Sequence, residues 1–252
     1  MKIGIVGLGL IGGSIFKNLL QTQNHEVIGI SQSQKGENIT NNYESLKNSD
    51  IIFVCKPMNK TLATLDILNE ILPKNTIVTD VCSLKRFVTN RDYKFNFIPS
   101  HPMAGTENQG YDSSFAELFK GAKWVITTEK NSSTNKLEEI IRELGAQPIY
   151  TTAEEHDKAV ALISHLPMVI SQALFKTASK DEFALKIASS GFRDTTRLAM
   201  SNIEMACDMV EMNSDNIENS LLMLYKVLGE LLTPKYKDEI TQIRTERKKM
   251  FR

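Results

Sequence analysis

A glycine-rich turn close to the start of the chain restricts the folds open to it more than any other feature. The apolar run at residues 2–6 leads directly into the turn, which reads Gly7-Leu8-Gly9-Leu10-Ile11-Gly12. In such a turn the first glycine allows the tight bend, the second lets backbone approach a pyrophosphate, and the third lets helix and strand pack closely. The helix that follows offers free N–H groups to phosphates. These six residues therefore predict a dinucleotide-binding site.

Strand and helix patterns alternate through the first 150 residues. Apolar runs typical of buried strands fall at residues 2–6, 26–30, 50–55, 75–81, 95–99, 123–127 and 147–150. Helical patterns, with apolar residues at spacings of three and four, fall at residues 10–21, 62–72 and 134–144. This alternation predicts a doubly wound, mostly parallel sheet of the Rossmann type, because parallel neighbours need crossover connections.

The pattern changes after residue 151. Residues 153–179, 184–189 and 202–232 have helical patterns, and no strand-like run follows. The tail at residues 235–252 mixes basic and acidic side chains, as a solvated helix face does. We therefore expect an α/β Rossmann domain at residues 1–151, followed by an all-helical domain at residues 152–252.

Charge and cysteine content exclude several classes of protein. The 30 Lys and Arg residues balance the 30 Asp and Glu residues, so nothing points to nucleic acid or an anionic membrane as a partner. No run approaches the ~20 apolar residues that span a bilayer, and the N-terminus lacks the layout of a signal peptide. The three cysteines form no CxxC pair, which argues against a disulfide framework or a metal site. We expect a cytoplasmic protein.

The end of the second expected strand indicates which dinucleotide binds. An NAD-specific domain carries Asp or Glu there to bind the ribose 2′-hydroxyl. This chain instead has Ser31-Gln32-Ser33-Gln34-Lys35, in which hydroxyl, amide and ammonium groups can accept a 2′-phosphate. The loop favours NADP over NAD.

Four short segments are more specific than the glycine turn. They are residues 79–85 (TDVCSLK), 100–107 (SHPMAGTE), 163–167 (ISHLP) and 190–197 (SGFRDTTR). With the glycine turn, and in this order from Lys2 to about Asn202, they resemble the prephenate/arogenate dehydrogenase family of tyrosine biosynthesis. The loop after the second strand is most similar to its NADP-using, arogenate-type members.

The resemblance implies a reaction. The substrate is prephenate or arogenate, which loses its ring carboxylate as CO₂ while the C4 hydrogen leaves as hydride to NADP or NAD. The product is 4-hydroxyphenylpyruvate or tyrosine, and the sequence leaves open which substrate is used.

Two residues are the candidates for catalysis. His101 matches the catalytic histidine of the family, and a neutral imidazole with an ordinary pKa of ~6.5 can accept the proton of the C4 hydroxyl. Ser83 matches the active-site serine, although a serine after a strand also serves as a helix N-cap.

Three residues are the candidates for substrate binding. Arg197 matches the arginine that would clamp the side-chain carboxylate, and Arg193 is a helper or a salt-bridge partner of Asp194. His165 either lines the substrate or packs in the core. Many relatives carry a second histidine three residues further on, where this chain has Met168.

The end of the third expected strand is a further candidate for cofactor contact, and the remaining histidines are not assigned to the site. Cys55-Lys56-Pro57 would run past the cofactor, with Lys56 near a phosphate or free in solvent. We assign His25 and His156 as surface or structural residues.

Two other functions compete with this interpretation. A β-hydroxyacid dehydrogenase shares the fold but needs a GxxxGxGxxxK helix that residues 153–190 lack. A protein that senses NADP without turnover would have no use for His101. The family forms homodimers through the helical domain, and this chain offers an apolar stripe that could also be core: Leu221, Leu222, Leu224, Leu228 and Leu231.

Overall fold

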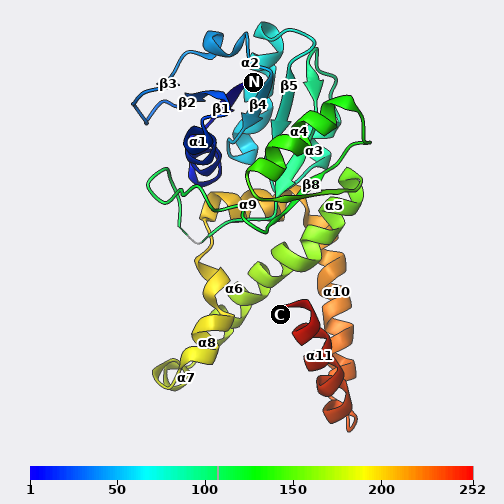
Figure 1. Ribbon diagram of the computed structural model, residues 1–252. Helices are drawn as coiled ribbons and strands as arrows, with labels where there is room; N and C mark the ends of the chain where they lie inside the picture. Colours follow the sequence, from blue (N-terminus) through cyan, green and yellow to red (C-terminus); the bar gives the residue numbers. More distant parts are fainter. Residues whose placement is uncertain (107, 252) are drawn as a thin grey trace.

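The computed structural model describes residues 1–106 and 108–251, so Glu107 and Arg252 lie outside it. Figure 1 shows a sheet flanked by helices in the N-terminal part, with the C-terminal helices below it. These helices leave the α/β part as two arms, one formed by α6, α7 and α8 and the other by α10 and α11. The predicted fold class, a Rossmann domain followed by helices, is confirmed.

The main sheet has six strands, all parallel, in the order β3-β2-β1-β4-β5-β6. Their bounds are β1 Lys2–Val6, β2 Glu26–Ile30, β3 Ile39–Thr40, β4 Ile51–Val54, β5 Ile77–Asp80 and β6 Asn96–Phe97. The register aligns Val6 with both Ile30 and Val54, and Val54 with Asp80. The carboxyl ends of four strands therefore meet at one edge, on either side of β1, where the strand order reverses and such folds bind ligands.

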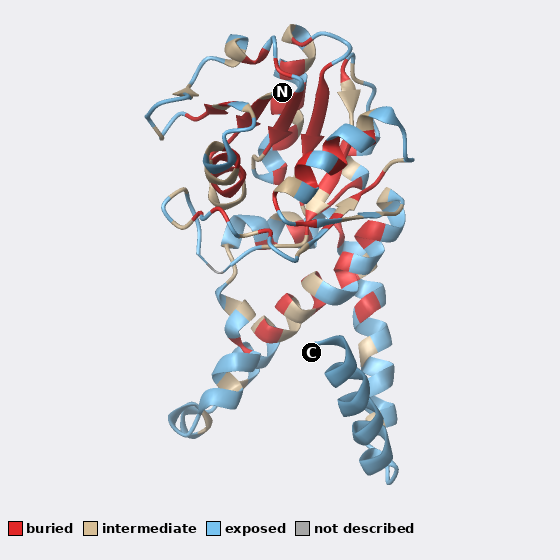
Figure 2. Ribbon diagram, viewed as in Figure 1, coloured by how far each residue is buried: buried red, intermediate tan, exposed pale blue. Residues whose placement is uncertain are grey.

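Alternation along the strands explains the two-sided core (Figure 2). Ile51 and Phe53 pack on one face of the sheet with helices α1 (Leu10–Thr22) and α4 (Ser132–Glu143). Ile52 and Val54 pack on the other face with α2 (Met58–Ile71). Successive side chains of a strand point to opposite faces, so a strand covered on both sides is apolar throughout.

A second, three-stranded sheet was not expected. It consists of β7 (Ser100–Pro102), β8 (Lys123–Ile126) and β9 (Gln147–Tyr150); β7 and β8 are antiparallel, and β8 and β9 are parallel. The strand predicted at residues 95–99 is only Asn96–Phe97; the Ile98 N–H still donates to Val78, and the Pro99 carbonyl then accepts from the Thr127 N–H next to β8. The chain then pairs with β8, so His101 lies within a strand rather than after one.

The first long helix of the C-terminal domain is divided by a turn of π-helix. Helix α5 (Ala153–Val160) runs into the π turn η2 (Ala161–His165), and α6 (Leu166–Ala178) follows with Pro167 in its first turn. A proline cannot donate to the preceding turn, and single π turns are one way in which helices accommodate such a break. The kink expected at Pro167 is thus an irregular turn that ends at His165.

The remaining helices differ from the predicted spans. They are α3 (Arg86–Thr89), α7 (Glu182–Lys186), α8 (Ser190–Thr195), α9 (Ile203–Met212), α10 (Ser214–Leu231) and α11 (Tyr236–Met250), with 3₁₀ turns η1 (Tyr43–Leu46) and η3 (Arg197–Met200). The predicted helix at 202–232 is interrupted at Asn213, and α8 was not anticipated.

By length and composition, the continuous run Ala153–Ala178 is a candidate membrane span, contrary to the sequence-based expectation. Its contacts are those of a packed helix instead. Asp157 accepts hydrogen bonds from the backbone of the α/β domain, and α6 packs against η3 and α10. A single such helix among the described residues is weak evidence for a membrane span, and 33% of its apolar window is buried.

Candidate active site

The glycine turn has the geometry that a pyrophosphate site needs. Gly7 has φ +97°, and a Cβ on Gly12 would stand 2.0 Å from the Gly7 carbonyl oxygen. A Cβ on Gly9, in contrast, would meet no protein atom within 4 Å. Gly9 caps α1 without a side-chain hydrogen bond, so the first N–H groups of that helix remain available. The turn therefore fits a dinucleotide, because protein atoms crowd it at Gly7 and Gly12 while the space beside Gly9 is open.

The loop after β2 presents polar groups at the same edge. Ser31 directly follows β2 and is buried beside β3. Its Oγ accepts a hydrogen bond from the Gln34 backbone N–H at 3.0 Å. Gln32, Ser33 and Lys35 are exposed. No carboxylate stands between Ser31 and Lys35.

The segment after β4 passes directly behind the glycine turn. The Cys55 carbonyl would lie 2.6 Å from a Cβ on Gly7, and Cys55 N–H donates to the Val6 carbonyl at 2.7 Å. Lys56 is half-buried, and its pKa is lowered first by burial and then by the nearby charge of Lys60. Pro57 is exposed and precedes the first turn of α2.

A buried ion pair organises the chain after β5. The Lys85 ammonium is fully buried, forms an ion pair with the equally buried Asp80, and donates to the Ser100 carbonyl at 2.6 Å. Asp80 also accepts from the backbone N–H groups of Cys82, at 3.0 Å, and Ser100, at 3.3 Å. The pair therefore joins the loop that carries half-buried Ser83 to the strand that carries His101.

Ser83 and His101 are the two predicted catalytic residues. The Ser83 Oγ lies 3.3 Å from the Met58 Sδ, a weak acceptor. His101 is half-buried in β7, and its Nδ1 lies 3.0 Å from Nε2 of His156. Burial lowers the pKa of His101 well below its usual value, and the positive charges that His156, Lys85 and His165 carry or can acquire lower it further. His101 is therefore neutral at neutral pH, as a proton acceptor must be.

His156 is a residue whose place in the site the sequence did not reveal. It is buried on α5, reaches across the domain boundary to His101, and lies 2.8 Å through its Nδ1 from Oδ1 of Asp157. The assignment of His156 as surface or structural missed this contact. The available signal was the His-Asp pair in a helix opened by a capping box at Thr152, the first turn after the domain boundary.

His165 lies in the same cluster. It is fully buried at the end of the π turn, and its Nδ1 lies 3.3 Å from Nδ2 of Asn213. Its Nε2 has no hydrogen-bond partner within the described chain. Burial lowers the pKa of His165 to about 4, against the opposing effect of Asp157. A buried nitrogen without a partner is what a site that awaits a polar ligand atom contains.

The two candidate arginines are not on one helix face. Arg193 is exposed on α8 and donates from Nε to Asp194 at 3.1 Å, which is the salt bridge that the sequence offered as an alternative. Exposed Arg197 begins the 3₁₀ turn η3, which packs against α6, the helix that follows His165.

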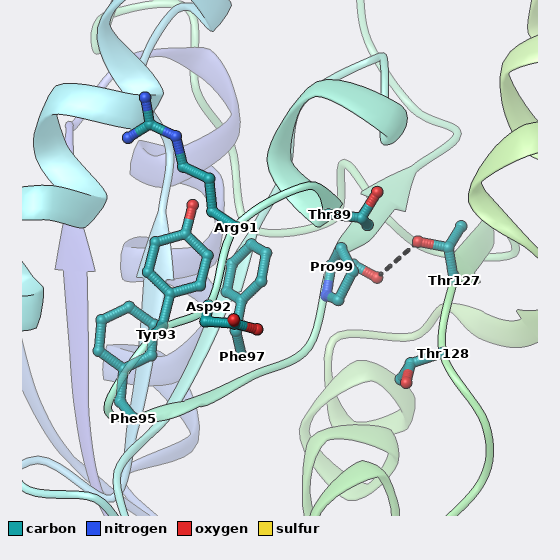
Figure 3. Close-up of a pocket in the computed structure, with 9 residues that line it drawn as sticks. All are labelled: Thr89, Arg91, Asp92, Tyr93, Phe95, Phe97, Pro99, Thr127 and Thr128. Carbon is teal, nitrogen blue, oxygen red and sulfur yellow. Dashed lines mark hydrogen bonds between the residues drawn. The ribbon is translucent and has the colours of Figure 1, made fainter.

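A surface cavity of about 350 Å³ lies apart from these residues (Figure 3). It is lined by Arg91, the rings of Tyr93, Phe95 and Phe97, and Thr127, which donates to the Pro99 carbonyl at 3.4 Å. It contains no glycine of the turn and no histidine, so it does not belong to the site.

Within the described residues, no cluster of His, Cys, Asp or Glu could hold a metal ion.

Comparisons with known proteins agree with this arrangement. Residues 20–150 match the model of the prephenate dehydrogenase nucleotide-binding domain, and residues 152–244 match the prephenate dehydrogenase dimerization domain. The first match begins after the glycine turn, which rests on its own geometry. A nucleotide-binding domain and the glycine turn together support a nicotinamide dinucleotide as cofactor.

Individual relatives point the same way. The chain is 30% identical to the cyclohexadienyl dehydrogenase of Zymomonas mobilis over 236 residues, which cover 84% of this chain and 80% of the relative. It is 33% identical to the Synechocystis arogenate dehydrogenase structure, with a TM-score of 0.85 over 99% of this chain and 100% of that one. The Aquifex aeolicus prephenate dehydrogenase, in complex with hydroxyphenyl propionate and NAD⁺, is 25% identical with a TM-score of 0.86 over 98% and 96% of the two chains.

Both domain matches and these relatives agree, and neither a β-hydroxyacid dehydrogenase nor a non-catalytic sensor is favoured. The chain is an oxidoreductase that belongs to the prephenate dehydrogenase family.

Proposed function

We propose that this protein catalyses the NAD(P)-dependent oxidative decarboxylation of prephenate, arogenate or both. The observation that carries the proposal is His101, which is neutral and half-buried at the boundary between the dinucleotide domain and the helical domain. The family membership and the glycine turn provide the chemical setting.

The reaction needs one proton acceptor beside the ring. When bound, the nicotinamide ring supplies the acceptor for the hydride that leaves C4. His101 takes the proton of the C4 hydroxyl as the carbonyl forms, and gives it back to the phenolate oxygen once CO₂ has left. Ser83, on the loop that the Lys85–Asp80 pair ties to the strand of His101, would hydrogen-bond the same hydroxyl. Holding these groups in place supplies much of the catalysis, because folding has already fixed them in position and the reaction no longer bears that loss of entropy.

Substrate binding falls to the helical domain. The unpartnered Nε2 of buried His165 is a donor for a substrate oxygen. Arg197, which begins η3, would pair its planar guanidinium with the side-chain carboxylate in two hydrogen bonds. Arg193 would play a secondary part in substrate binding, because its guanidinium already forms a salt bridge with Asp194.

The loop after β2 supports NADP as the preferred cofactor. Ser31 Oγ accepts from Gln34 and keeps its own proton free to donate, and Lys35 is exposed next to it. A 2′-phosphate would meet donors and a cation there, where a carboxylate would repel it.

The exposed leucine stripe supports a homodimer. Leu221, Leu222 and Leu228 are 38%, 62% and 48% exposed, so within the described chain they are not the internal core that the sequence also allowed. Apolar side chains gathered on one helix mark an interaction surface, and the matching family domain carries the description of a dimerization domain. A second copy of this chain is the occupant that we propose.

The free Cys55, Cys82 and Cys207 support a reducing, cytoplasmic location.

Nicotinamide reduction by the purified protein tests the function. Four mixtures are needed, which pair prephenate or arogenate with NAD⁺ or NADP⁺, and the product of the best pair is identified. We expect turnover in at least one mixture, with NADP⁺ better than NAD⁺. Absence of turnover in all four mixtures, with NADP⁺ still bound, would contradict the proposal.

A further inference from the structure

Three side chains form a hydrogen-bonded chain that crosses the domain boundary. His101 Nδ1 lies 3.0 Å from His156 Nε2, and His156 Nδ1 lies 2.8 Å from Asp157 Oδ1. We propose that His156 and Asp157 are positioning residues that hold His101 in the tautomer whose Nε2 is free to accept the substrate proton. The inference rests on the proposed function and adds residues that its chemistry did not assign.

The direction of each hydrogen bond follows from its donors. Asp157 Oδ1 also accepts from the Lys85 backbone N–H at 2.8 Å, and Oδ2 accepts from the Arg86 N–H at 3.0 Å. Backbone N–H groups can only donate, so the carboxylate accepts on both oxygens and His156 Nδ1 must carry a hydrogen. When His156 has its hydrogen on Nδ1 alone, its Nε2 can only accept, and His101 donates from Nδ1. The lone pair of His101 is left on Nε2.

Asp157 is held in place from both domains. The amides of Lys85 and Arg86 belong to the α/β domain, whereas Asn213, which begins α10, donates from Nδ2 to the Asp157 carbonyl at 2.9 Å. Both Asp157 and His156 are 3% exposed. The carboxylate therefore cannot rotate away from His156 without breaking both of its hydrogen bonds to the α/β domain.

The chain makes proton acceptance depend on domain docking. His101 lies on β7, and His156 and Asp157 lie on α5. The other charged or titratable groups packed around His101 are Lys85, its partner Asp80, and His165 on the π turn. If the helical domain moved away, His101 would lose the acceptor that fixes its tautomer while the buried Lys85–Asp80 pair stayed behind.

Substitutions at His156 separate this role from a structural one. In Asp157→Asn, an amide nitrogen in place of Oδ1 would reverse both hydrogen bonds but would lose the one from the Lys85 N–H. An amide nitrogen in place of Oδ2 would lose only the one from the Arg86 N–H and leave His156 Nδ1 donating, so the test rests on His156. His156→Gln keeps an acceptor oxygen near His101 Nδ1, and His156→Leu removes it. His156→Gln is thus the matched control for His156→Leu.

We would measure the tautomer of His101 by ¹⁵N NMR in the wild-type protein and the variants, and kcat, KM and their pH profiles in the best substrate mixture. We expect hydrogen on Nδ1 in the wild type and in His156→Gln. For His156→Leu we expect kcat to fall about a hundredfold or more, with KM and NADP⁺ binding changed less than threefold.

Hydrogen on Nε2 in the wild-type protein would overturn the inference, and so would wild-type kcat in a folded His156→Leu. The tautomer measurement needs neither turnover nor a variant. A wild type that turns over no substrate but shows hydrogen on Nδ1 therefore contradicts the proposed function and supports the hydrogen-bonded chain.

Discussion

Two alanine substitutions in the glycine turn should have opposite effects on stability and on cofactor binding. A Cβ on Gly12 would stand 2.0 Å from the Gly7 carbonyl oxygen and 2.9 Å from the Cys55 Cβ, whereas a Cβ on Gly9 would meet nothing within 4 Å. The Gly7 carbonyl cannot move aside easily, because Gly7 N–H donates to the Ile30 carbonyl at 2.9 Å. Gly12 is thus crowded by the protein and Gly9 is not.

The geometry sets the magnitudes. Real Cβ atoms essentially never come within 3.0 Å of such neighbours, so Gly12→Ala must displace backbone by about an ångström. Overpacking of this kind destabilises by about 1–3 kcal/mol, and we expect the upper end. For a chain of this size that corresponds to a loss of roughly 6–12 °C in Tm. Gly9→Ala should change stability by only about 0.5 kcal/mol, since alanine is a poorer N-cap.

For cofactor binding, Gly9→Ala should be the more damaging of the two substitutions. Gly9 faces the space in which the pyrophosphate would lie, so its added methyl should weaken NADP⁺ binding at least tenfold, which is about 1.4 kcal/mol. Thermal unfolding without cofactor and calorimetric NADP⁺ titration measure the two effects on the same samples. If Gly9→Ala bound NADP⁺ as tightly as the wild type, the cofactor would not lie at this turn. If Gly12→Ala were as stable as the wild type, the packing argument would be wrong.

Three further predictions follow from the same geometry. Ser31→Asp should shift the ratio of kcat/KM for NADP⁺ and NAD⁺ toward NAD⁺, and an unchanged ratio would refute the role given to the loop after β2. Arg197→Lys should raise the substrate KM at least tenfold, because an ammonium cannot replace the guanidinium fork; an unchanged KM would remove the clamp. The folded-state pKa values of His101 and His165 lie below the usual value for histidine, with that of His165 at about 4, so stability should be highest above about pH 6.5 and fall as the pH drops from there toward 4. The slope is up to about 1.4 kcal/mol per pH unit for each histidine, and a flat urea midpoint between about pH 7 and about pH 5 would contradict it.

Local features of this chain could be predicted because their causes are local. The glycine turn needs only its three glycines and the strand before it, and the bounds of β1, β2 and β9 agree with the predicted runs. Residues 95–99 form less strand than predicted, because the pattern of apolar residues does not show that the pairing passes from β5 to β8 after Ile98. The π turn before Pro167 is missed for a similar reason, since periodicity shows the helix but not its hydrogen-bond register.

The site was predictable only within each domain. His101 and Ser83 follow predicted strands, so the sequence predicts that both lie toward one edge of the sheet. His156 is 55 residues away from His101 in sequence, and their contact depends on how the two domains dock. No local pattern encodes that docking. The same limit applies to the leucine stripe of α10, where the sequence could not distinguish an exposed face from a core.

The central claim is that neutral His101 accepts the substrate proton, and His101→Asn tests it most directly. An asparagine in β7 retains hydrogen-bonding capacity but cannot act as the base. In the mixture that the wild type uses best, we expect kcat/KM to fall about a hundredfold or more, with NADP⁺ binding and Tm close to the wild-type values. A His101→Asn variant that retained near-full turnover would contradict the account.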